Sequence, residues 1–165
     1  MADKNRIRVG LIADTHGLLR PEAKEFLRTS DYIVHAGDIG DRGILGELEA
    51  IARVCAVRGN NDTEPWAAEL RETELLTVGA LAVYVIHDLA DLRLEPDAAA
   101  VQVVVSGHSH KPMLERRNGV LFVNPGSAGP RRFKLPIAIG ELLIEGASAA
   151  ARIFDLKDAR LLASL

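Results

Sequence analysis

The stretch IRVGLIADTHG, residues 7–17, sets the pattern for the fold, because a mostly aliphatic run ends abruptly in an acid and a histidine. A run of this length, bounded by polar and glycine residues, is typical of a β-strand. Pro21 then begins a helix-like segment that extends to about Arg28, since proline is tolerated in the first turn of a helix. A second aliphatic run follows at 32–36, so the chain begins as a strand–helix–strand unit.

Farther along the chain, strands become more frequent than helices. Aliphatic residues with helical spacing at 44–52 precede a third strand-like run at 53–57. The turn pairs Gly79-Ala80 and Asn118-Gly119 each separate two short runs and predict hairpins. The later strands are expected at residues 75–78, 81–86, 101–105, 113–116, 120–123, 137–144 and 151–154. This order predicts an α/β fold with a mixed sheet, or two sheets packed together.

Length and composition narrow the class of protein. The chain has 165 residues, close to the ~150 of one compact domain, so we expect residues 1–165 to form a single domain. Aliphatic side chains must build the core, since 48% of the chain is hydrophobic but only 4% is aromatic. The net charge of −3 and the few aromatic residues argue against a nucleic-acid duplex as partner.

The cysteine content and the N-terminal residues indicate a cellular compartment. The chain has a single cysteine, Cys55, which excludes an internal disulfide framework. Cys55 lies in an aliphatic run, so we expect it to be a small buried hydrophobic residue. Residues 1–6 lack the apolar stretch of a signal peptide, and no run approaches the ~18 apolar residues of a membrane span. We therefore expect a cytoplasmic protein with no membrane partner. Three C-terminal leucines could dock on the body or form a homo-oligomer contact: Leu161, Leu162 and Leu165.

Five of the aliphatic runs are followed directly by residues that can bind a metal ion. The carboxyl ends of strands in α/β sheets form the rim where ligands bind, so these residues can meet without long loops. Each motif alone has an ordinary interpretation, since Gly-Asp and Gly-Asn are common turn pairs and a histidine at a strand end is often only hydrogen-bonded. The combination favours a metal site made of Asp14, His16, Asp38, Asn60, His87, His108 and His110. His35 lies inside a run, and we expect it to support or pack against this site.

The ordered motifs resemble those of the calcineurin-like metallophosphoesterases. That family carries D-x-H, G-D, G-N-x-D/E, a lone His and G-H-x-H, each after a strand, and the matching segments here are 14–16, 37–38, 59–62, 87 and 107–110. The short length and the segments 14–17, 35–38 and 124–127 resemble the small single-domain YfcE-type phosphodiesterase branch. The resemblance extends over roughly residues 7–155.

The resemblance implies a four-layer αββα sandwich, in which two packed mixed sheets flanked by helices carry a dinuclear metal site. It implies that Asp14, His16 and His110 hold one ion, that Asn60, His87 and His108 hold the other, and that Asp38 bridges them. Mixed carboxylate and imidazole ligands suit transition-metal ions better than calcium or magnesium. Manganese is the expected ion, with nickel, iron, cobalt and zinc as alternatives. Two such ions can clamp a phosphoryl group and activate a bridging hydroxide that attacks phosphorus in line.

Residues near the ligands carry further expected roles. The catalytic set implied by the resemblance is Asp38, Asn60, Asn61 and Asp62, with Arg58 and Asp62 orienting the ligands. Asn60, Arg131 and Arg132 are candidates for binding the substrate phosphate, although the two arginines could equally be ordinary solvated residues.

Two positions depart from the family pattern. Asn61 stands where many members have a histidine that serves as general acid, and an amide cannot supply that proton. Because losing a general acid costs ~10²–10⁴-fold, we expect a preference for good leaving groups such as aryl esters or activated diesters. Asp88 stands where glycine usually follows the lone histidine, and the sequence leaves its role open.

The resemblance therefore implies a hydrolase of phosphoric ester bonds, with a phosphodiesterase acting on a small phosphoester favoured. One alternative is a phosphomonoesterase acting on small metabolites. The other is a non-catalytic protein-binding scaffold, like the retromer subunit that shares this fold. All seven candidate ligand positions carry competent residues, which favours an enzyme. A DNA-repair nuclease fits less well, because the chain leaves no room for a capping domain or a basic platform.

Overall fold

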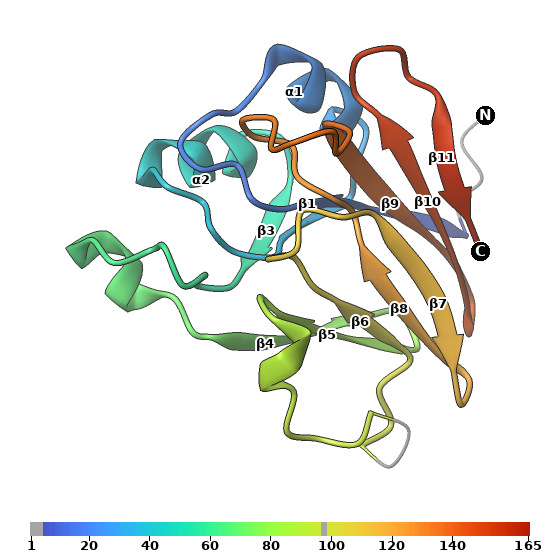
Figure 1. Cartoon of the computed structure of the whole chain (residues 1–165). Coiled ribbons are helices and arrows are strands. Elements are labelled where there is room, and N and C mark those ends of the chain that lie inside the picture. Colours follow the sequence, from blue (N-terminus) through green and yellow to red (C-terminus); the bar gives the residue numbers. More distant parts are fainter. Residues whose placement is uncertain (1–4, 97–98) are drawn as a thin grey trace.

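The computed structural model describes residues 5–96 and 99–165, and within them two mixed β-sheets face each other (Figure 1). The first sheet has the spatial order β11 (Leu161–Ser164), β10 (Ser148–Asp155), β9 (Ala138–Glu145), β1 (Arg6–Ile12), β2 (Tyr32–His35) and β3 (Arg53–Ala56). The second has the order β4 (Thr73–Val78), β5 (Leu81–Ile86), β6 (Val103–Val105), β8 (Val120–Asn124) and β7 (Met113–Arg117). Parallel pairing joins β1, β2 and β3 in one sheet and β5, β6 and β8 in the other; the remaining neighbours pair antiparallel.

Two short helices cover the outer face of the first sheet (Figure 1). They are α1 (Pro21–Leu27), which begins with its proline, and α2 (Arg42–Glu49), whose N-cap Asp41 accepts a hydrogen bond from the backbone N–H of Gly43. Two 3₁₀ helices follow later strands, η1 (Pro65–Glu69) and η2 (Leu89–Asp91).

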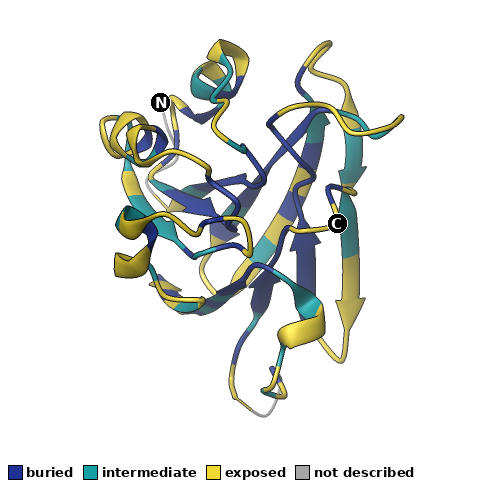
Figure 2. Ribbon diagram, turned by 60° about the vertical axis from the view of Figure 1, so that its left-hand side comes forward, coloured by how far each residue is buried: buried dark blue, intermediate teal, exposed yellow. Residues whose placement is uncertain are grey.

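Three apolar clusters separate the layers of the fold. The largest lies between the sheets and consists mainly of valine, leucine and isoleucine side chains, among them Leu11, Val34, Val83, Val105 and Val123. A second joins α1 and α2 to the first sheet, and a third lies on the outer face of the second sheet, where Leu89 and Leu92 cover Val104 and Phe122. Figure 2 shows buried residues concentrated in the strands and exposed residues on the helices and loops. The predicted two-sheet architecture is confirmed, with a thin fourth layer made of η2 and Leu92.

The structure contains each predicted strand, with boundaries shifted by at most three residues. Both predicted hairpins are present, and Asn118 and Gly119 have φ values of 50° and 79°, as a type I′ turn requires. The helix expected at 44–52 begins earlier, at Arg42, because Asp41 caps it. Strand β11 was not predicted, because four residues without strict alternation give a weak strand signal.

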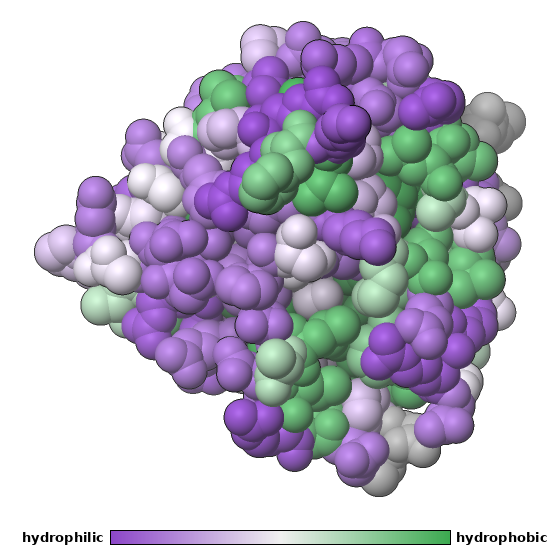
Figure 3. All heavy atoms as spheres, viewed as in Figure 1, coloured by the Kyte–Doolittle hydropathy of each residue, from purple (hydrophilic) through white to green (hydrophobic). Residues whose placement is uncertain are grey.

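Leu161 and Leu162 belong to β11, which docks on β10 as an edge strand, and Leu165 follows β11 with its backbone hydrogen-bonded to that of Ala151. Leu162 packs against the core between the sheets, whereas Leu161 and Leu165 remain about half exposed. Hydrophobic side chains accordingly gather on the surface over β10 and β11 (Figure 3). No helix in the described part of the chain is long and apolar enough to cross a membrane.

Candidate metal centre

Loops after five strands meet at one place because backbone hydrogen bonds tie them together. In the first sheet, the N–H of Asp14 donates to the carbonyl of Gly37 (3.0 Å) and that of His16 to the carbonyl of Asp38 (2.9 Å). In the second sheet, the N–H of Gly107 donates to the carbonyl of His87 (2.9 Å). The two sheets are joined where His87 Nδ1 donates to the carbonyl of Ala36 (2.7 Å). The carboxyl ends of strands from both sheets therefore contribute to one site.

One group of side chains consists of Asp14, His16 and His110. Their candidate donor atoms all lie within 4.8 Å of one another. The Nε2 atoms of the two imidazoles are 3.1 Å apart, and Asp14 Oδ1 lies 3.6 Å from His110 Nε2. The rings of His16 and His110 stack with 5.1 Å between their centroids. The short distances show that the Nε2 atoms of both rings face the Asp14 carboxylate. This arrangement can hold one cation.

A second group consists of Asn60, His87 and His108. Asn60 Oδ1 lies 3.0 Å from His87 Nε2 and 3.2 Å from His108 Nδ1. The carbonyl of Ala36 accepts the Nδ1 proton of His87, which leaves Nε2 free to face this group. One amide oxygen and two imidazole nitrogens thus converge beside the first group.

Asp38 lies between the two groups. Its Oδ2 atom is 3.7 Å from His16 Nε2 and 3.3 Å from His87 Nε2. Both the backbone N–H (2.9 Å) and the side-chain amide (3.0 Å) of Asn61 donate to this carboxylate. Burial works to raise the pKa of Asp38, but the contact with His87 and the hydrogen bonds from Asn61 hold it well below its ordinary value. Asp38 is therefore an anion placed to contact both groups.

The chemistry of the donor set fits divalent cations. Asp14 is fully buried, and neither carboxylate oxygen has a hydrogen-bond partner among the described residues. Burial raises the pKa of Asp14 to about 7, because a charged carboxylate is unfavourable where neither water nor a cation contacts it. A buried anion of this kind is normally paired or bound to a metal. Nitrogen and oxygen donors together match transition-metal ions.

Most of the candidate ligands have an unusual backbone conformation. Five of them have positive φ, between 45° and 69°: Asp14, His16, Asp38, His108 and His110. Residues other than glycine adopt this region rarely, at a cost of order 1–3 kcal/mol each, and such residues cluster at functional sites. Gly59 allows a close approach, because a side chain there would overlap Asp38 Oδ1.

Residues around the candidate ligands fix the loops in place. Asp62 accepts hydrogen bonds from the backbone N–H groups of Ile39, Gly40 and Gly59, so it joins the loops after β2 and β3. His35 is buried and bonds Thr15, whose hydroxyl donates to the carbonyl of Ile39. Because Gly37 N–H donates to His35 Nδ1, the proton of this ring is on Nε2 and points to Thr15. The expected supporting position of His35 agrees with these contacts.

The end of β8 and the loop that follows it support the site through hydrogen bonds that the sequence did not reveal. Asn124 Nδ2 donates to the carbonyl of Gly107 (2.8 Å), and Ser127 Oγ donates to the carbonyl of Asp14 (3.0 Å). The segment 124–127 therefore holds the backbone beside candidate ligands from both sheets. The only signal in the sequence was its resemblance to the family motif.

The three arginines for which the sequence predicts a role in the site lie in different environments. Arg58 donates to Glu72 (3.1 Å) instead of contacting a candidate ligand. Arg131 donates to the carbonyl of Leu135 within its own loop. Arg132 is exposed and near enough to act on the site, since burial first and its positive charge second lower the pKa of His110 to about 4.

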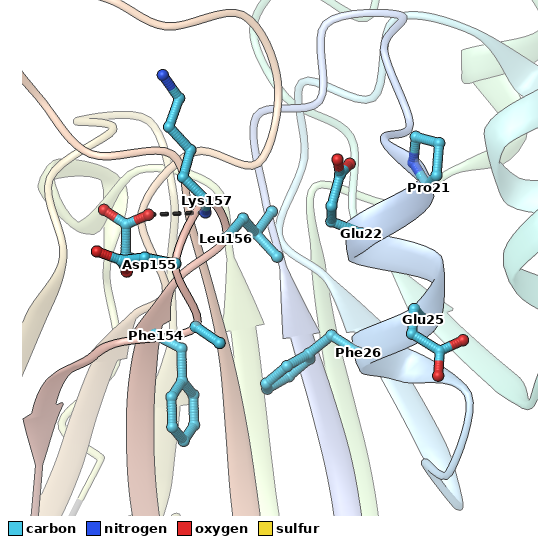
Figure 4. A pocket seen from close by; sticks show the side chains of 10 residues that line it. Pro21, Glu22, Glu25, Phe26, Phe154, Asp155, Leu156 and Lys157 are labelled. Atoms are coloured by element: carbon cyan, nitrogen blue, oxygen red, sulfur yellow. Dashed lines mark hydrogen bonds between the residues drawn. The ribbon is translucent and has the colours of Figure 1, made fainter.

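A cleft of about 430 Å³ adjoins the second group. It is lined by Asn60, His87 and His108 and by polar residues that include Asp88 and Asp91. A larger pocket of about 780 Å³ lies between α1 and the β10–β11 connection, where Phe26 and Phe154 approach each other (Figure 4). None of the candidate ligands lines that larger pocket. The cleft, and not the larger pocket, therefore lies beside the candidate ligands.

Two mixed sheets face each other, and buried carboxylates and imidazoles that could hold metal ions gather at their strand ends. The chain matches the calcineurin-like phosphoesterase superfamily domain over residues 7–145 and belongs to that superfamily. This confirms the family predicted from the motifs.

Archaeal relatives support the assignment. A probable metallophosphoesterase of Methanothermobacter thermautotrophicus is 35% identical over 88% of this chain and 90% of its own length. Another of Methanocaldococcus jannaschii is 36% identical over 72% of this chain and 67% of its own length. A phosphodiesterase of the same organism is 24% identical over 73% of this chain and 83% of its length.

Solved structures share the fold. Vacuolar protein sorting 29 of Cryptosporidium parvum superposes with a TM-score of 0.82 at 21% identity, covering 98% of both chains. The Escherichia coli phosphoesterase YfcE superposes with a TM-score of 0.75 at 22% identity, covering 96% of this chain and 98% of its own. Vacuolar protein sorting 29 of Entamoeba histolytica, in complex with zinc, gives 0.77 at 22%, with the same coverage. The fold thus occurs in an enzyme and in sorting proteins alike.

Proposed function

We propose that this protein is a metal-dependent phosphodiesterase that hydrolyses a P–O bond of a small phosphoester at a dinuclear site. The observation that supports this most strongly is the position of Asp38, whose Oδ2 atom lies within 3.7 Å of imidazoles from both groups. The second observation is the buried Asp14 carboxylate, which lacks a protein partner among the described residues. A carboxylate between two donor groups is what a pair of ions held close together requires.

The ligand assignment follows the two groups. Asp14, His16 and His110 hold one ion, Asn60, His87 and His108 hold the other, and Asp38 bridges them. Manganese is our first choice, with nickel, iron, cobalt and zinc as alternatives; zinc is supported by the neighbour from Entamoeba histolytica. When bound, two such ions would supply a clamp for the phosphoryl group and an activated bridging hydroxide.

The surrounding residues hold and orient these groups. Asn61 directs the Asp38 carboxylate through two hydrogen bonds, and Asp62 fixes the loops that carry Asp38 and Asn60. Asn60 has a second role in binding the substrate phosphate, together with Arg131 and Arg132. Arg132 is the stronger candidate of the two arginines, because Arg131 is engaged in its own loop.

The preference for diesters depends on the leaving group. Asn61 cannot donate a proton at neutral pH, so the leaving oxygen must depart without a general acid at this position. Aryl esters and activated diesters are therefore the substrates of choice, and the relative named a phosphodiesterase supports this class. A phosphomonoesterase acting on small metabolites is the alternative within enzymes.

A non-catalytic scaffold is the alternative outside enzymes. The solved sorting proteins with this fold include one from Chaetomium thermophilum in complex with a cyclic peptide. Competent side chains at all seven candidate positions favour an enzyme. We further propose that the chain forms a single domain and acts in the cytoplasm. We propose a small-molecule substrate and no membrane or nucleic-acid partner, and we leave open whether the protein forms a homo-oligomer.

The decisive experiment is an activity assay of metal-free protein reconstituted with Mn²⁺, using aryl phosphodiester and aryl phosphomonoester substrates side by side. Asp38→Asn should bring activity to background and reduce the bound metal, because one residue contacts both ions. Asp41→Asn is the matched control, since it makes the same chemical change at a helix cap nearby and asparagine also caps helices well.

The same assay separates the alternatives. Higher kcat/KM on the monoester would favour the phosphomonoesterase, and no metal-dependent hydrolysis with Mn²⁺ or Ni²⁺ would favour the scaffold. Full metal content and normal turnover in Asp38→Asn would refute the bridging role. Arg132→Ala should raise KM more than Arg131→Ala does.

A further inference from the structure

Asp88 contacts one of the candidate ligands. It follows His87 directly at the end of β5, and its Oδ2 atom lies 3.5 Å from Nε2 of His108. Its other oxygen, Oδ1, accepts a hydrogen bond from the backbone N–H of Ala90 (3.0 Å), which fixes the carboxylate at the N-cap of η2. The carboxylate is thus anchored on one side and directed at the imidazole on the other.

Packing holds the His108 ring on one side only, where it meets the edge of the His87 ring at 5.2 Å between centroids. Its side chain is 44% exposed, whereas the side chains of His87 and His110 are buried. Among the described residues, the polar contacts of this ring are two: Nδ1 with Asn60 Oδ1 at 3.2 Å and Nε2 with Asp88. The ring therefore lies between an oxygen on the metal side and a carboxylate on the far side.

We propose that Asp88 is a positioning residue that holds His108 with its Nε2 proton toward the carboxylate and its Nδ1 lone pair toward the second ion. The inference rests on the proposed dinuclear function. A carboxylate that accepts the proton of one ring nitrogen fixes the tautomer and the orientation of a metal-binding histidine, and losing such a partner weakens metal binding by roughly 10- to 100-fold. Asp88, which departs from the family pattern, thus gains a defined role here.

The competing explanation is that Asp88 only caps η2. Asp88→Ser separates the two roles, because serine is also a good N-cap but is too short to reach His108. Asp91→Asn is the matched control. Asp91 lines the same cleft, so this substitution removes a negative charge there but leaves the contact between Asp88 and His108 intact.

The test is a calorimetric titration of the metal-free proteins with Mn²⁺, supported by thermal unfolding without metal. We expect Asp88→Ser to bind the second ion roughly 10- to 100-fold more weakly, with the first ion and the metal-free melting temperature unchanged. Asp91→Asn should bind both ions as the wild type does. Asp88→Asn, which keeps an oxygen acceptor but loses the charge, should lie between the two.

The outcomes that overturn the inference differ from those that overturn the function. Equal affinity for both ions in the wild type and Asp88→Ser, with hydrolysis intact, refutes the role of Asp88 alone. The same loss in Asp91→Asn also refutes it, since charge in the cleft would then be the cause. A wild-type protein that binds a single ion refutes the inference together with the dinuclear proposal.

Discussion

Asp14 and the residues with positive φ show where single side chains carry the energetic cost of the site. A buried carboxylate with a pKa of about 7 and five candidate ligands in the left-handed region are each unfavourable for folding by themselves. They persist because the surrounding hydrogen bonds determine the loop conformations. We expect unfavourable groups to gather in this way where a bound cation stabilises them.

His35 gives a prediction on pH, because burial lowers its pKa to about 3. The folded pKa lies below the ordinary 6.5, so the unfolded chain binds the proton more readily. The contribution of His35 to stability is therefore present above pH 6.5 and is lost as the pH falls, by up to ~1.4 kcal/mol per unit. Urea unfolding of metal-free wild type and His35→Gln should show a difference that shrinks from pH 7 to pH 5. Parallel pH curves would contradict this prediction.

Asn61 gives a prediction on substrate choice. Replacing Asn61 with histidine supplies the missing general acid while keeping the backbone N–H that donates to Asp38. The variant should gain roughly 10²-fold or more in kcat on alkyl phosphoesters relative to aryl esters, and the measurement is the ratio of the two rates. Unchanged selectivity would show that the leaving group receives its proton from another source.

Among the structural elements, the loops after β2 and β3 depend most on one residue. Asp62 accepts three backbone N–H groups in these loops, whereas Asp41 accepts one exposed N–H at the start of α2. Asp62→Ala should lower the free energy of unfolding by ~3 kcal/mol or more, because buried donors lose a charged acceptor. Asp41→Ala should cost ~1 kcal/mol, as is usual for a lost cap.

Urea unfolding at pH 7 measures both variants under the same conditions. Asp62→Ala should also lower the metal affinity, since Asp38 and Asn60 are carried by the loops that Asp62 joins. Equal losses of stability in the two variants would mean that the loops are held by other contacts.

For the molecule as a whole, the site joins the two sheets. Asp14, His16, Asp38 and Asn60 follow strands of the first sheet, and His87, His108 and His110 follow strands of the second. The sheets also meet through the apolar cluster between them and through a hydrogen bond from Arg116 in β7 to the carbonyl of Ala149 in β10. Bound ions would therefore add contacts across the interface between the sheets, so metal binding should stabilise the entire fold.

This gives a prediction for thermal unfolding. An ion present at about 100 times its dissociation constant stabilises the folded state by ~2.7 kcal/mol, which for a chain of this size raises Tm by roughly 5–10 °C. Addition of Mn²⁺ to metal-free protein should produce this shift, and a chelator should reverse it. The Asp38→Asn variant should respond less, and an equal shift in that variant would indicate binding elsewhere.

Much of the fold was predictable because its signals are local. Aliphatic runs and turn pairs such as Asn118-Gly119 identified the strands and both hairpins, since side-chain periodicity and glycine conformation act over a few residues. Strand β11 was missed because its four residues become a strand only by pairing with β10. The motifs after the strands identified the family, as the match over residues 7–145 confirms.

The sequence by itself determined which residues can act as ligands and that they follow strands. Only the tertiary structure decided which atoms face one another: Asp38 between two imidazoles, Ser127 on the carbonyl of Asp14, and Asp88 against His108. These contacts join residues that are 20 or more positions apart, and their geometry depends on how the two sheets pack and how the loops are hydrogen-bonded. Local patterns fix the strands, whereas the relative placement of their ends is a property of the packed core.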